Sequence, residues 1–397
     1  MRPLAVTEHT LVSALGAGRA AHFEALAAAR TGLARRDFET ASLGTWIGIV
    51  EGLDALRLPA ALAAWDCRNN RLAEAGLRAD GFAASVARAV ARWGAARIGV
   101  FVGTSTSGIL HTEIAYRQRD AASGALPGWL DYEHTHNIAS TARYVRARLA
   151  LAGPAFVVST ACSSSAKVYA NAARMIGAGL VDAAVVGGVD SLCMTTLYGF
   201  RSLELVSPDI CRPWDAARSG LSIGEGAAFA LLERTPAPDG APRAWLLGSG
   251  ESSDGHHMSA PHPEGAGAAQ AMRAALADAG LAPGDVGYLN LHGTATPGND
   301  AAEDRAVRSV FGTDVACSST KGYTGHTLGA AGAVEAAITM LALEHGWLPP
   351  TLNLSTPDPA LALKVLRQPL ARRVRVAASN SFGFGGSNAC LVLGAAP

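Results

Sequence analysis

The 397-residue sequence has no excess charge of either sign and no long hydrophobic run. Lysine and arginine total 33, and aspartate and glutamate total 33, so the formal net charge is zero. Proteins that bind nucleic acids usually carry a basic excess, and its absence argues against that class. No stretch of about 18 uninterrupted apolar residues occurs, so we expect no membrane-spanning helix. The apolar stretch 179–200, for example, is broken by Asp182 and Asp190.

Cysteine is sparse, and no two of the six cysteines form a CxxC pair. This spacing argues against a zinc cluster and favours a reducing compartment. The N-terminal residues MRPLAVTEHT lack the long apolar core of a secretory signal. Hydrophobic residues make up 49% of the chain and charged residues 17%, which is too apolar for a disordered protein. Together these features predict a soluble, cytoplasmic α/β protein.

Lysine is the scarcest basic residue, since Lys167, Lys321 and Lys364 are the only three among 33 basic side chains. Arginine therefore serves wherever any cation suffices. A lysine in such a chain is a candidate for a role that needs a compact ammonium group, because the two side chains are not interchangeable. The alternative is chance.

Short apolar runs alternate with alanine-rich segments of helical periodicity. We expect strands at residues 98–102, 155–159, 183–187, 226–232, 286–291, 315–318, 374–378 and 389–393. We expect helices at residues 17–29, 82–93, 164–176, 266–279, 301–310 and 328–345. Several strand segments are continuously apolar, as in sheets that are buried on both faces. The alternation predicts a layered α/β fold.

Two segments share a plan in which a strand, a tight polar turn and a small-residue helix follow one another. One covers residues 156–176 and the other begins at residue 315. This likeness indicates an internal duplication. Turn-forming residues cluster at 236–242, in the sequence PAPDGAP, which marks a boundary between the halves. We therefore predict an N-terminal half of residues 1–235 and a C-terminal half of residues 236–397.

Cys162 is the first candidate for chemistry, in the segment VVSTACSSS of residues 157–165. It stands where a predicted strand turns into a predicted helix. The N-terminus of a helix favours a thiolate and lowers the pKa of a cysteine there. Its free N–H groups can also bind an oxyanion. The alternative is a buried cysteine with a purely structural role.

Two histidines lie in similarly polar turns. His292 follows an apolar strand in LNLHGTATPGND. Ligands of α/β proteins commonly bind at the ends of strands. His326 lies in a glycine-rich turn, five residues after Lys321. The alternatives are a loop histidine without a role, a helix-capping histidine and a solvated lysine.

Nucleotide and metal sites are disfavoured by the remaining patterns. The glycine-rich segment 380–388 (NSFGFGGSN) lacks both a GK[ST] ending and GxGxxG spacing before a helix, and segment 220–226 fails the same tests. His134 and His136 are spaced as if on one face of a strand. A second group of histidines lies in one loop and consists of His256, His257 and His262. Neither group has a cysteine or carboxylate at the spacing of metal ligands, which argues against a metal site.

Taken together, these motifs resemble those of the β-ketoacyl-acyl carrier protein synthases, the condensing enzymes of fatty acid and polyketide assembly. The resemblance covers nearly the whole chain, in the family's order. It is carried by residues 160–165 (TACSSS), 292–294 (HGT), 321 with 325–329 (GHTLG), 380–386 (NSFGFGG), 211–215 (CRPWD) with 224–226 (GEG), and 253–254 (SD) with 258–263 (MSAPHP).

The resemblance implies a thiolase-like fold with two pseudo-symmetric halves and five αβαβα layers. It implies a dimer, normally a homodimer, although a heterodimer is the alternative. The implied partner is acyl carrier protein, which brings the malonyl and acyl thioesters on its own phosphopantetheine. No cofactor, metal or nucleic acid is implied.

The resemblance also implies residue roles. Cys162 is the nucleophile that takes the acyl group. His292 and His326 donate hydrogen bonds to the enolate that forms when carbon dioxide leaves, and Lys321 orients the site. The remaining matches are the N–H groups of Cys162 and Phe384 as oxyanion donors, Phe384 as a gate, Asp300 and Glu335 as supporting acids, Thr294 and Thr296 as phosphopantetheine-binding residues, and Thr106 as a chain-length gate.

Four alternatives are open to a chain of this kind. A thiolase normally has a second cysteine in the C-terminal glycine-rich loop, but Cys390 lies beyond that loop. A plant-type ketosynthase would use a Cys-His-Asn set, which the surroundings of His326 disfavour. A catalytically silent partner subunit would usually lack the cysteine. A cysteine hydrolase would release acyl chains without a malonyl donor, and the paired histidine motifs disfavour it.

Some positions depart from the commonest fatty-acid pattern. Ser165 stands where many family members have glycine, and Thr106 stands where a larger residue is frequent. The segment 132–136 (YEHTH) is unusual near the part of the chain that faces a dimer partner. These departures favour a specialised polyketide or polyene pathway over housekeeping fatty acid synthesis, and they leave the reaction unchanged.

Overall fold

Strands and helices alternate along the chain in the computed structural model, which describes residues 1–236 and 240–396. The strands are β1 (Leu4–Ser13), β2 (Gly16–Ala17), β3 (Ala34–Arg35), β4 (Trp46–Gly48), β5 (Ile98–Gly103), β6 (Ala155–Val158), β7 (Ala183–Asp190), β8 (Ile223–Gly224), β9 (Gly226–Glu233), β10 (Ala244–Ser253), β11 (Tyr288–Asn290), β12 (Cys317–Ser318), β13 (Trp347–Leu348), β14 (Leu370–Ala371), β15 (Val376–Gly383) and β16 (Ser387–Ala395). The helices are α1 (Arg19–Ala27), α2 (Arg68–Arg78), α3 (Phe82–Trp93), α4 (Ile109–Arg117), α5 (Ser140–Arg148), α6 (Ser164–Gly177), α7 (Met194–Ser202), α8 (Ala266–Ala279), α9 (Pro297–Phe311), α10 (Lys321–Thr324) and α11 (Ala331–His345).

The main strands fall into two sets of five with the same plan. The hydrogen-bonded path runs β12-β11-β15-β16-β10-β1-β9-β7-β5-β6. In the first set, β1, β9 and β7 are antiparallel neighbours, and β7, β5 and β6 are parallel. The second set repeats this pattern as β10, β16, β15, β11 and β12. Among the described residues, strands of the two sets pair only where Leu4–Val6 lie beside 244–246, so the topology is that of two pseudo-symmetric halves.

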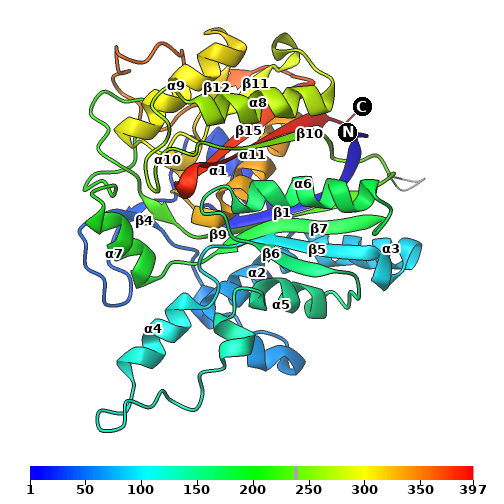
Figure 1. Ribbon diagram of the computed structural model, residues 1–397, viewed down its shortest axis with the longest axis vertical. Coiled ribbons are helices and arrows are strands. Elements are labelled where there is room, and N and C mark those ends of the chain that lie inside the picture. The colour runs from blue at the N-terminus through cyan, green and yellow to red at the C-terminus, as the bar shows by residue number, and fades with distance from the viewer. Residues whose placement is uncertain (237–239, 397) are drawn as a thin grey trace.

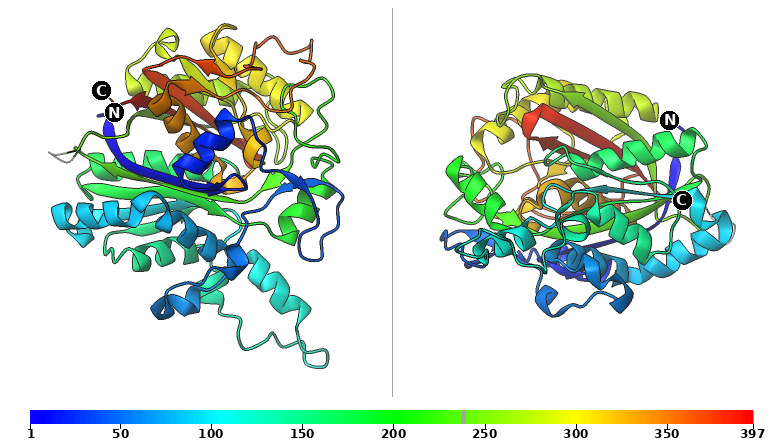
Figure 2. Two further views of the ribbon diagram at one scale, coloured as in Figure 1. Left: turned by 180° about the vertical axis from the view of Figure 1, so that it is seen from behind. Right: turned by 60° about the horizontal axis from the view of Figure 1, so that its bottom comes forward.

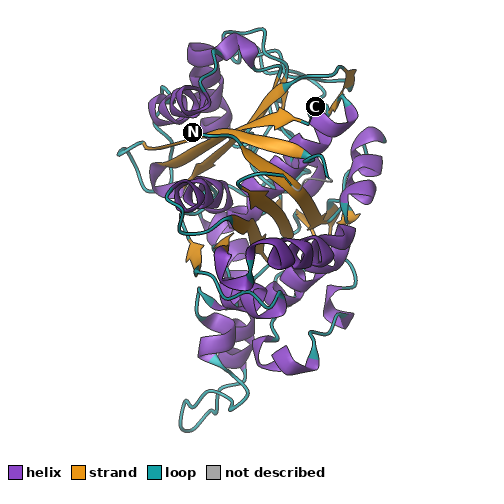
Figure 3. Cartoon of the chain, turned by 90° about the vertical axis from the view of Figure 1, so that its right-hand side faces the viewer, coloured by secondary structure: helices purple, strands orange, loops and turns teal. Residues whose placement is uncertain are grey.

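Helices and strand sets stack in five layers, as Figure 1 shows. Helices α6 and α11 lie between the two sets, α8 and α9 cover the outer face of the β10 set, and α2, α3 and α5 cover that of the β1 set. Figure 3 shows the same stacking from the side, with strands between helical layers. The central helix α11 is buried almost along its whole length. This arrangement confirms the predicted α/β, thiolase-like fold.

All eight predicted strands and all six predicted helices are present, with shifts of a few residues at their ends. Two long strands, β1 and β10, were not predicted. In β1 the apolar run is interrupted by Glu8 and His9, which are nevertheless buried. In β10 the glycines hide the strand pattern, because a Cβ at Gly250 would lie 2.0 Å from the carbonyl oxygen of Ala271 in α8. Close helix packing, rather than strand propensity, selects glycine there.

A projecting arm, defined as residues 109–138, extends from the layered body (Figure 2). It consists of α4, an irregular loop and a single π-helical turn at Tyr132–His136. The prediction that His134 and His136 share a strand face is therefore wrong. Their rings point to different partners, since His134 bonds to Asp131 and His136 bonds to Thr112. Exposed apolar side chains concentrate on the arm, namely Tyr116, Leu126, Trp129, Tyr132 and Ile138.

Three further expectations concern the whole chain. No described helix is long and apolar enough to cross a membrane. All six cysteines are buried and free. Of the predicted boundary loop 236–242, residues 237–239 lie outside the described residues, and the division into residues 1–235 and 236–397 stays a prediction.

Candidate active site

Cys162 stands in a tight turn between β6 and α6. Ala161, just before it, has a left-handed backbone with φ of 52°, a conformation that costs free energy and is typical of functional turns. The turn is fixed because the Thr160 N–H donates to Ser164 Oγ at 2.9 Å. Gly383 packs against the turn, where a Cβ would lie 2.8 Å from the Thr160 oxygen. The sulfur is held, nearly buried, in front of the helix.

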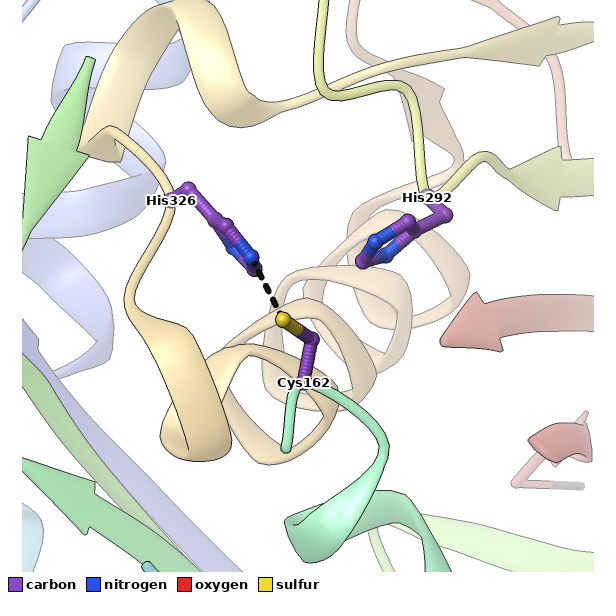
Figure 4. A group of neighbouring side chains, drawn as sticks. All are labelled: Cys162, His292 and His326. Carbon is purple, nitrogen blue, oxygen red and sulfur yellow. Dashed lines mark hydrogen bonds between the residues drawn. The ribbon is translucent and has the colours of Figure 1, made fainter. Parts of the chain in front are cut away.

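His326 is held by its backbone on both sides. Its N–H donates to Ser222 O at 2.8 Å, and its own carbonyl accepts from Gly224 N–H at 3.0 Å. The imidazole Nε2 lies 3.0 Å from Cys162 Sγ (Figure 4). Its Nδ1 has no hydrogen-bond partner among the described residues. The ring is therefore free to carry its proton on either nitrogen.

His292 follows β11 and is positioned by an acid on α9. The backbone N–H groups of His292 and Gly293 donate to the two carboxyl oxygens of Glu303, at 2.8 and 2.7 Å. The His292 and His326 rings are 5.4 Å apart and almost perpendicular. Ligand atoms of Cys162, His292 and His326 all lie within 4.8 Å of one another. Three residues separated by up to 164 positions thus converge on one point (Figure 4).

Lys321 lies behind the two histidines and is almost fully buried. Its ammonium contacts the Glu335 carboxyl group and the His292 carbonyl oxygen, and it lies 3.4 Å from His292 Nδ1. An ammonium has only donors, so His292 Nδ1 must accept. The proton of the neutral ring is then on Nε2, the nitrogen that faces the cavity. Lys321 and Glu335 are therefore brought to the site together.

Both imidazoles are neutral in this environment. Burial, and next the positive charge of Lys321, hold the pKa of His292 and of His326 well below the usual range. The prediction of a lowered thiol pKa is wrong for the resting site. Burial raises the pKa of Cys162 to about 12, since it outweighs the lowering effects of Lys321 and of the Phe384 N–H. A neutral thiol therefore faces two neutral rings.

Three buried acids surround the site, and the sequence predicted two of them. Burial raises the pKa of Asp300 to about 6 and the pKa values of Glu303 and Glu335 to about 7. Asp300 accepts the backbone N–H groups of Trp214 and Ala295, so it supports the turn that follows His292. Glu303 was missed, because an acid in an exposed-looking helix gives no signal of burial. Its only sequence clue is its place three residues after Asp300.

A cavity of about 180 Å³ opens onto the sulfur and both rings. Thr294 and Thr296 line it, and so does Phe384, whose ring lies 5.4 Å from that of Phe200. The Phe384 N–H is directed at the Cys162 sulfur. Thr106 does not line this cavity. It is buried, and its hydroxyl is bonded to Asp190 instead.

The donor atoms of Cys162, His292 and His326 are close enough to hold a soft metal ion. The buried ammonium of Lys321, beside His292, opposes a divalent cation there. The predicted loop histidines lie apart from this site. His256 and His262 have ring centres 5.2 Å from each other, and His257 accepts hydrogen bonds from the backbone of its own loop.

Two family profiles match the sequence. The family profile described as "Beta-ketoacyl synthase, N-terminal domain" matches residues 63–237, and that described as "Beta-ketoacyl synthase, C-terminal domain" matches residues 243–355. The chain is 40% identical over 305 residues to Nodulation protein E of Rhizobium meliloti, covering 75% of each chain. It is 33% identical to 3-oxoacyl-[acyl-carrier-protein] synthase 2 of Vibrio cholerae, covering 98% of each.

A solved relative is similar over the full length. It is a chain from the complex of ketosynthase ApeO with its chain length factor ApeC from Xenorhabdus doucetiae. The TM-score is 0.89 and the identity 39%, over 99% of this chain and 98% of that chain.

Proposed function

The chain belongs to the β-ketoacyl synthase family, and we propose that Cys162, His292 and His326 carry out its reaction. The family reaction is a decarboxylative Claisen condensation, which joins an acyl thioester to malonyl-acyl carrier protein. Its product is a β-ketoacyl-acyl carrier protein, so the chain is an acyltransferase. The convergence of one sulfur and two imidazoles within 4.8 Å carries the assignment of roles. The proposal needs no bound cofactor, because the carrier protein brings phosphopantetheine.

In the first step, Cys162 Sγ attacks the carbonyl carbon of the incoming acyl thioester. The negative oxygen that forms accepts hydrogen bonds from the N–H groups of Cys162 and Phe384. His326 Nε2, 3.0 Å from the sulfur, takes the thiol proton and passes it to the departing phosphopantetheine sulfur. One C–S bond forms and one breaks, and the histidine ends the step neutral. Because Nδ1 has no hydrogen-bond partner among the described residues, His326 can carry its proton on Nδ1 in this step and on Nε2 in the next.

In the second step, the malonyl thioester loses carbon dioxide. The bond between the carboxylate and the α-carbon breaks, and its electrons move into an enolate. His292 and His326 donate hydrogen bonds from Nε2–H to the enolate oxygen, each worth about 2.7–4 kcal/mol by analogy with an oxyanion-hole donor. The α-carbon then attacks the Cys162 thioester, the sulfur leaves as the thiolate, and it takes up a proton from solvent, because the loss of carbon dioxide consumes one proton overall. Each neutral imidazole has one N–H group to donate, and the tautomer with its proton on Nε2 can direct that group at the enolate oxygen.

Replacing the nucleophile tests this assignment. We expect Cys162→Ala to form no acyl-enzyme with an acyl-carrier protein, as read by intact-protein mass spectrometry, while malonyl decarboxylation persists. The matched control is Cys390→Ala, which removes an equally buried thiol in β16 and should leave acylation unchanged. An acyl adduct on the Cys162→Ala protein would overturn the assignment. Loss of activity in the Cys390 variant instead would favour the two-cysteine chemistry of a thiolase.

A second candidate is a catalytically silent subunit that shapes the cavity of an active partner. It has support because the solved relatives include ketosynthase–chain length factor complexes. The Cys162–His326 contact favours the active assignment. Acylation of Cys162 in the purified chain alone separates the two functions, since a silent subunit stays unmodified.

Assembly belongs to the same proposal. Those relatives are complexes of a ketosynthase with a chain length factor, so we propose that this chain also works in a dimer; the partner that we propose is a second copy. Strand β6 ends the strand path, and its outer edge has no partner among the described residues. The projecting arm adds unpartnered apolar side chains. Light scattering of the purified chain should give twice the monomer mass, and a monomer would instead favour a heteromeric partner.

A further inference from the structure

One buried carboxyl group outside the proposed chemistry gathers an unusual number of donors. Asp190, the last residue of β7, is fully buried. Its Oδ1 accepts from the hydroxyls of Thr104 and Thr106 at 2.6 and 2.7 Å, and from the N–H groups of Ser105 and Thr106 at 2.8 and 2.9 Å. Its Oδ2 accepts from the Ser105 hydroxyl and from the Gly329 N–H, both at 2.5 Å. No cation pairs with it among the described residues.

These donors come from two separate loops. The gate loop, defined as residues 104–107, follows β5 and contains Thr106, the position that matches a chain-length gate. The histidine turn, defined as residues 326–329, contains His326 and ends at Gly329. The Thr104 N–H also donates to Val158 O at 3.2 Å, at the end of the strand that leads to Cys162. The carboxyl group therefore joins the gate loop to the histidine turn.

Asp190 packs closely against the histidine turn. A Cβ at position 329 would lie 2.7 Å from Asp190 Oδ2 and 2.9 Å from the Ser105 N. The preceding residue, Leu328, has a left-handed backbone with φ of 54°. A branched residue held in that region is strained and persists only when its surroundings fix it. The Gly329 N–H bond to Asp190 is one such fixing contact.

The gate loop is held just as firmly. Ser107 also has a positive φ, of 42°, and its N–H donates to Thr104 Oγ1 at 3.1 Å. That same hydroxyl donates its proton to Asp190, so it cannot turn away. Thr106 is buried and stands apart from the cavity beside Cys162. We take Thr106 as the chain-length gate that the resemblance implies; on that assignment, an acyl chain that moves Thr106 aside must break its bonds to Asp190.

We propose that Asp190 is a positioning residue that couples the gate loop to the histidine turn. Through this one side chain, the passage of an acyl chain past Thr106 and the placement of His326 for decarboxylation depend on each other. The inference rests on the proposed function. It adds a determinant of chain length that touches neither the substrate nor the sulfur.

Asp190→Asn is the direct test, because the amide keeps the size but turns one acceptor into a donor that faces N–H groups. We expect malonyl decarboxylation to fall about tenfold or more, since small misplacements of catalytic groups carry costs of this size. We also expect the products to become longer or broader in chain length. Alkylation of Cys162 by iodoacetamide should be no slower, because the charge of Asp190 raises the pKa of that thiol.

Asp304→Asn provides a matched control. Asp304 is equally buried and accepts two backbone N–H groups, from Ala362 and Leu363, away from the site. The Asp304→Asn protein should be less stable than the wild type. The length of its acyl products should not change, and neither should the ratio of kcat to KM for acyl groups of different length. Unchanged product lengths and unchanged decarboxylation in folded Asp190→Asn would overturn the proposal. Absence of acylation in the wild-type chain would instead refute the proposed function.

A second variant keeps the test open if Asp190→Asn does not fold. Thr106→Val removes one hydroxyl donor, keeps the shape and leaves the carboxyl group in place. We expect it to shift product length and also to lower decarboxylation, although the substitution is not in the histidine turn. A change in product length alone would show that the two loops act independently, and the coupling would be refuted.

Discussion

At the residue scale, the Cys162 thiol resists ionisation in the resting site. Burial raises the pKa of Cys162 to about 12, so thiolate is rare at neutral pH. The rate of alkylation by iodoacetamide should therefore rise about tenfold per pH unit between pH 7 and 9, without a plateau. Mass-spectrometric time courses at several pH values measure this rate. A plateau below pH 8 would show that the thiol ionises at an ordinary pH.

The buried ion pair permits a separate prediction about electrostatics. Lys321→Met leaves the Glu335 carboxyl group without its partner, and breaking such a pair costs about 3–5 kcal/mol of unfolding free energy. The double variant Lys321→Met/Glu335→Gln should recover most of that loss, as measured by chemical denaturation. Malonyl decarboxylation should stay low in both variants, because no ammonium then holds the proton of His292 on Nε2, although burial still lowers the pKa values of His292 and His326. Recovery of decarboxylation in the double variant would show that Lys321 has only a structural role.

The residues that react were visible in the sequence because each lies in a short local motif. Cys162, His292, Lys321 and His326 carry glycine and small polar neighbours that mark tight turns. Glu303 and Asp190 were missed as site residues. Their importance comes from backbone N–H groups supplied by distant loops, and nothing in a linear motif shows which carboxyl group will be buried.

At the element scale, α1 carries a buried histidine that links pH to stability. His22 Nε2 lies 2.8 Å from Ser13 Oγ, and its Nδ1 lies 2.8 Å from the Gly18 oxygen. Burial lowers the pKa of His22 to about 4. Since the folded-state pKa lies below the unfolded value, the stabilisation is complete above pH 6.5. It is lost as the pH falls through about 4, by about 3 kcal/mol in total.

The variant His22→Gln isolates this contribution, because glutamine keeps polar groups but does not titrate. The difference in unfolding free energy between wild type and His22→Gln should shrink by about 3 kcal/mol from pH 7 to pH 4. Urea denaturation at both pH values measures it. Other groups titrate in the same range, but they cancel in the difference. Parallel pH profiles for the two proteins would contradict the prediction.

Two of the missed elements, β1 and α2, share one physical reason. Glu8 in β1 is buried because Arg19 and Arg243 pair with it, and such pairing across the fold has no local signal. The same holds for α2, where Arg68 and Glu225 form a buried pair. Elements with continuous apolar runs were predicted, whereas β1 and α2 were hidden by polar residues that distant partners neutralise.

At the scale of the whole molecule, the two halves share one core. The largest apolar cluster joins Leu11 and Val186 of the β1 set with Ala389 and Leu391 of the β10 set, through residues of α6 and α11. We therefore expect one cooperative unfolding transition despite the repeated topology. Calorimetry should give a calorimetric enthalpy equal to the van't Hoff enthalpy. Two resolved transitions would show that the halves are energetically independent.

The division of labour between the halves was only partly accessible from the sequence. The two strand–turn–helix segments indicated a duplication in the sequence. The matching strand order of the two sets shows that the duplication extends to the sheet topology. The convergence of β6 and β12 segments on a single site follows from the stacking of the halves, which no sequence period encodes.

The depth of the sulfur also governs what happens between the two substrates. Once the nucleophile carries its acyl group, the thioester lies beneath the surface in a cavity of about 180 Å³, and an acyl chain that fills this cavity displaces water from it. Hydrolysis of the thioester should then be slow, so the acyl-enzyme persists until malonyl-acyl carrier protein binds, even where that substrate is scarce. A site that is reluctant to ionise at rest thus gains a long-lived intermediate.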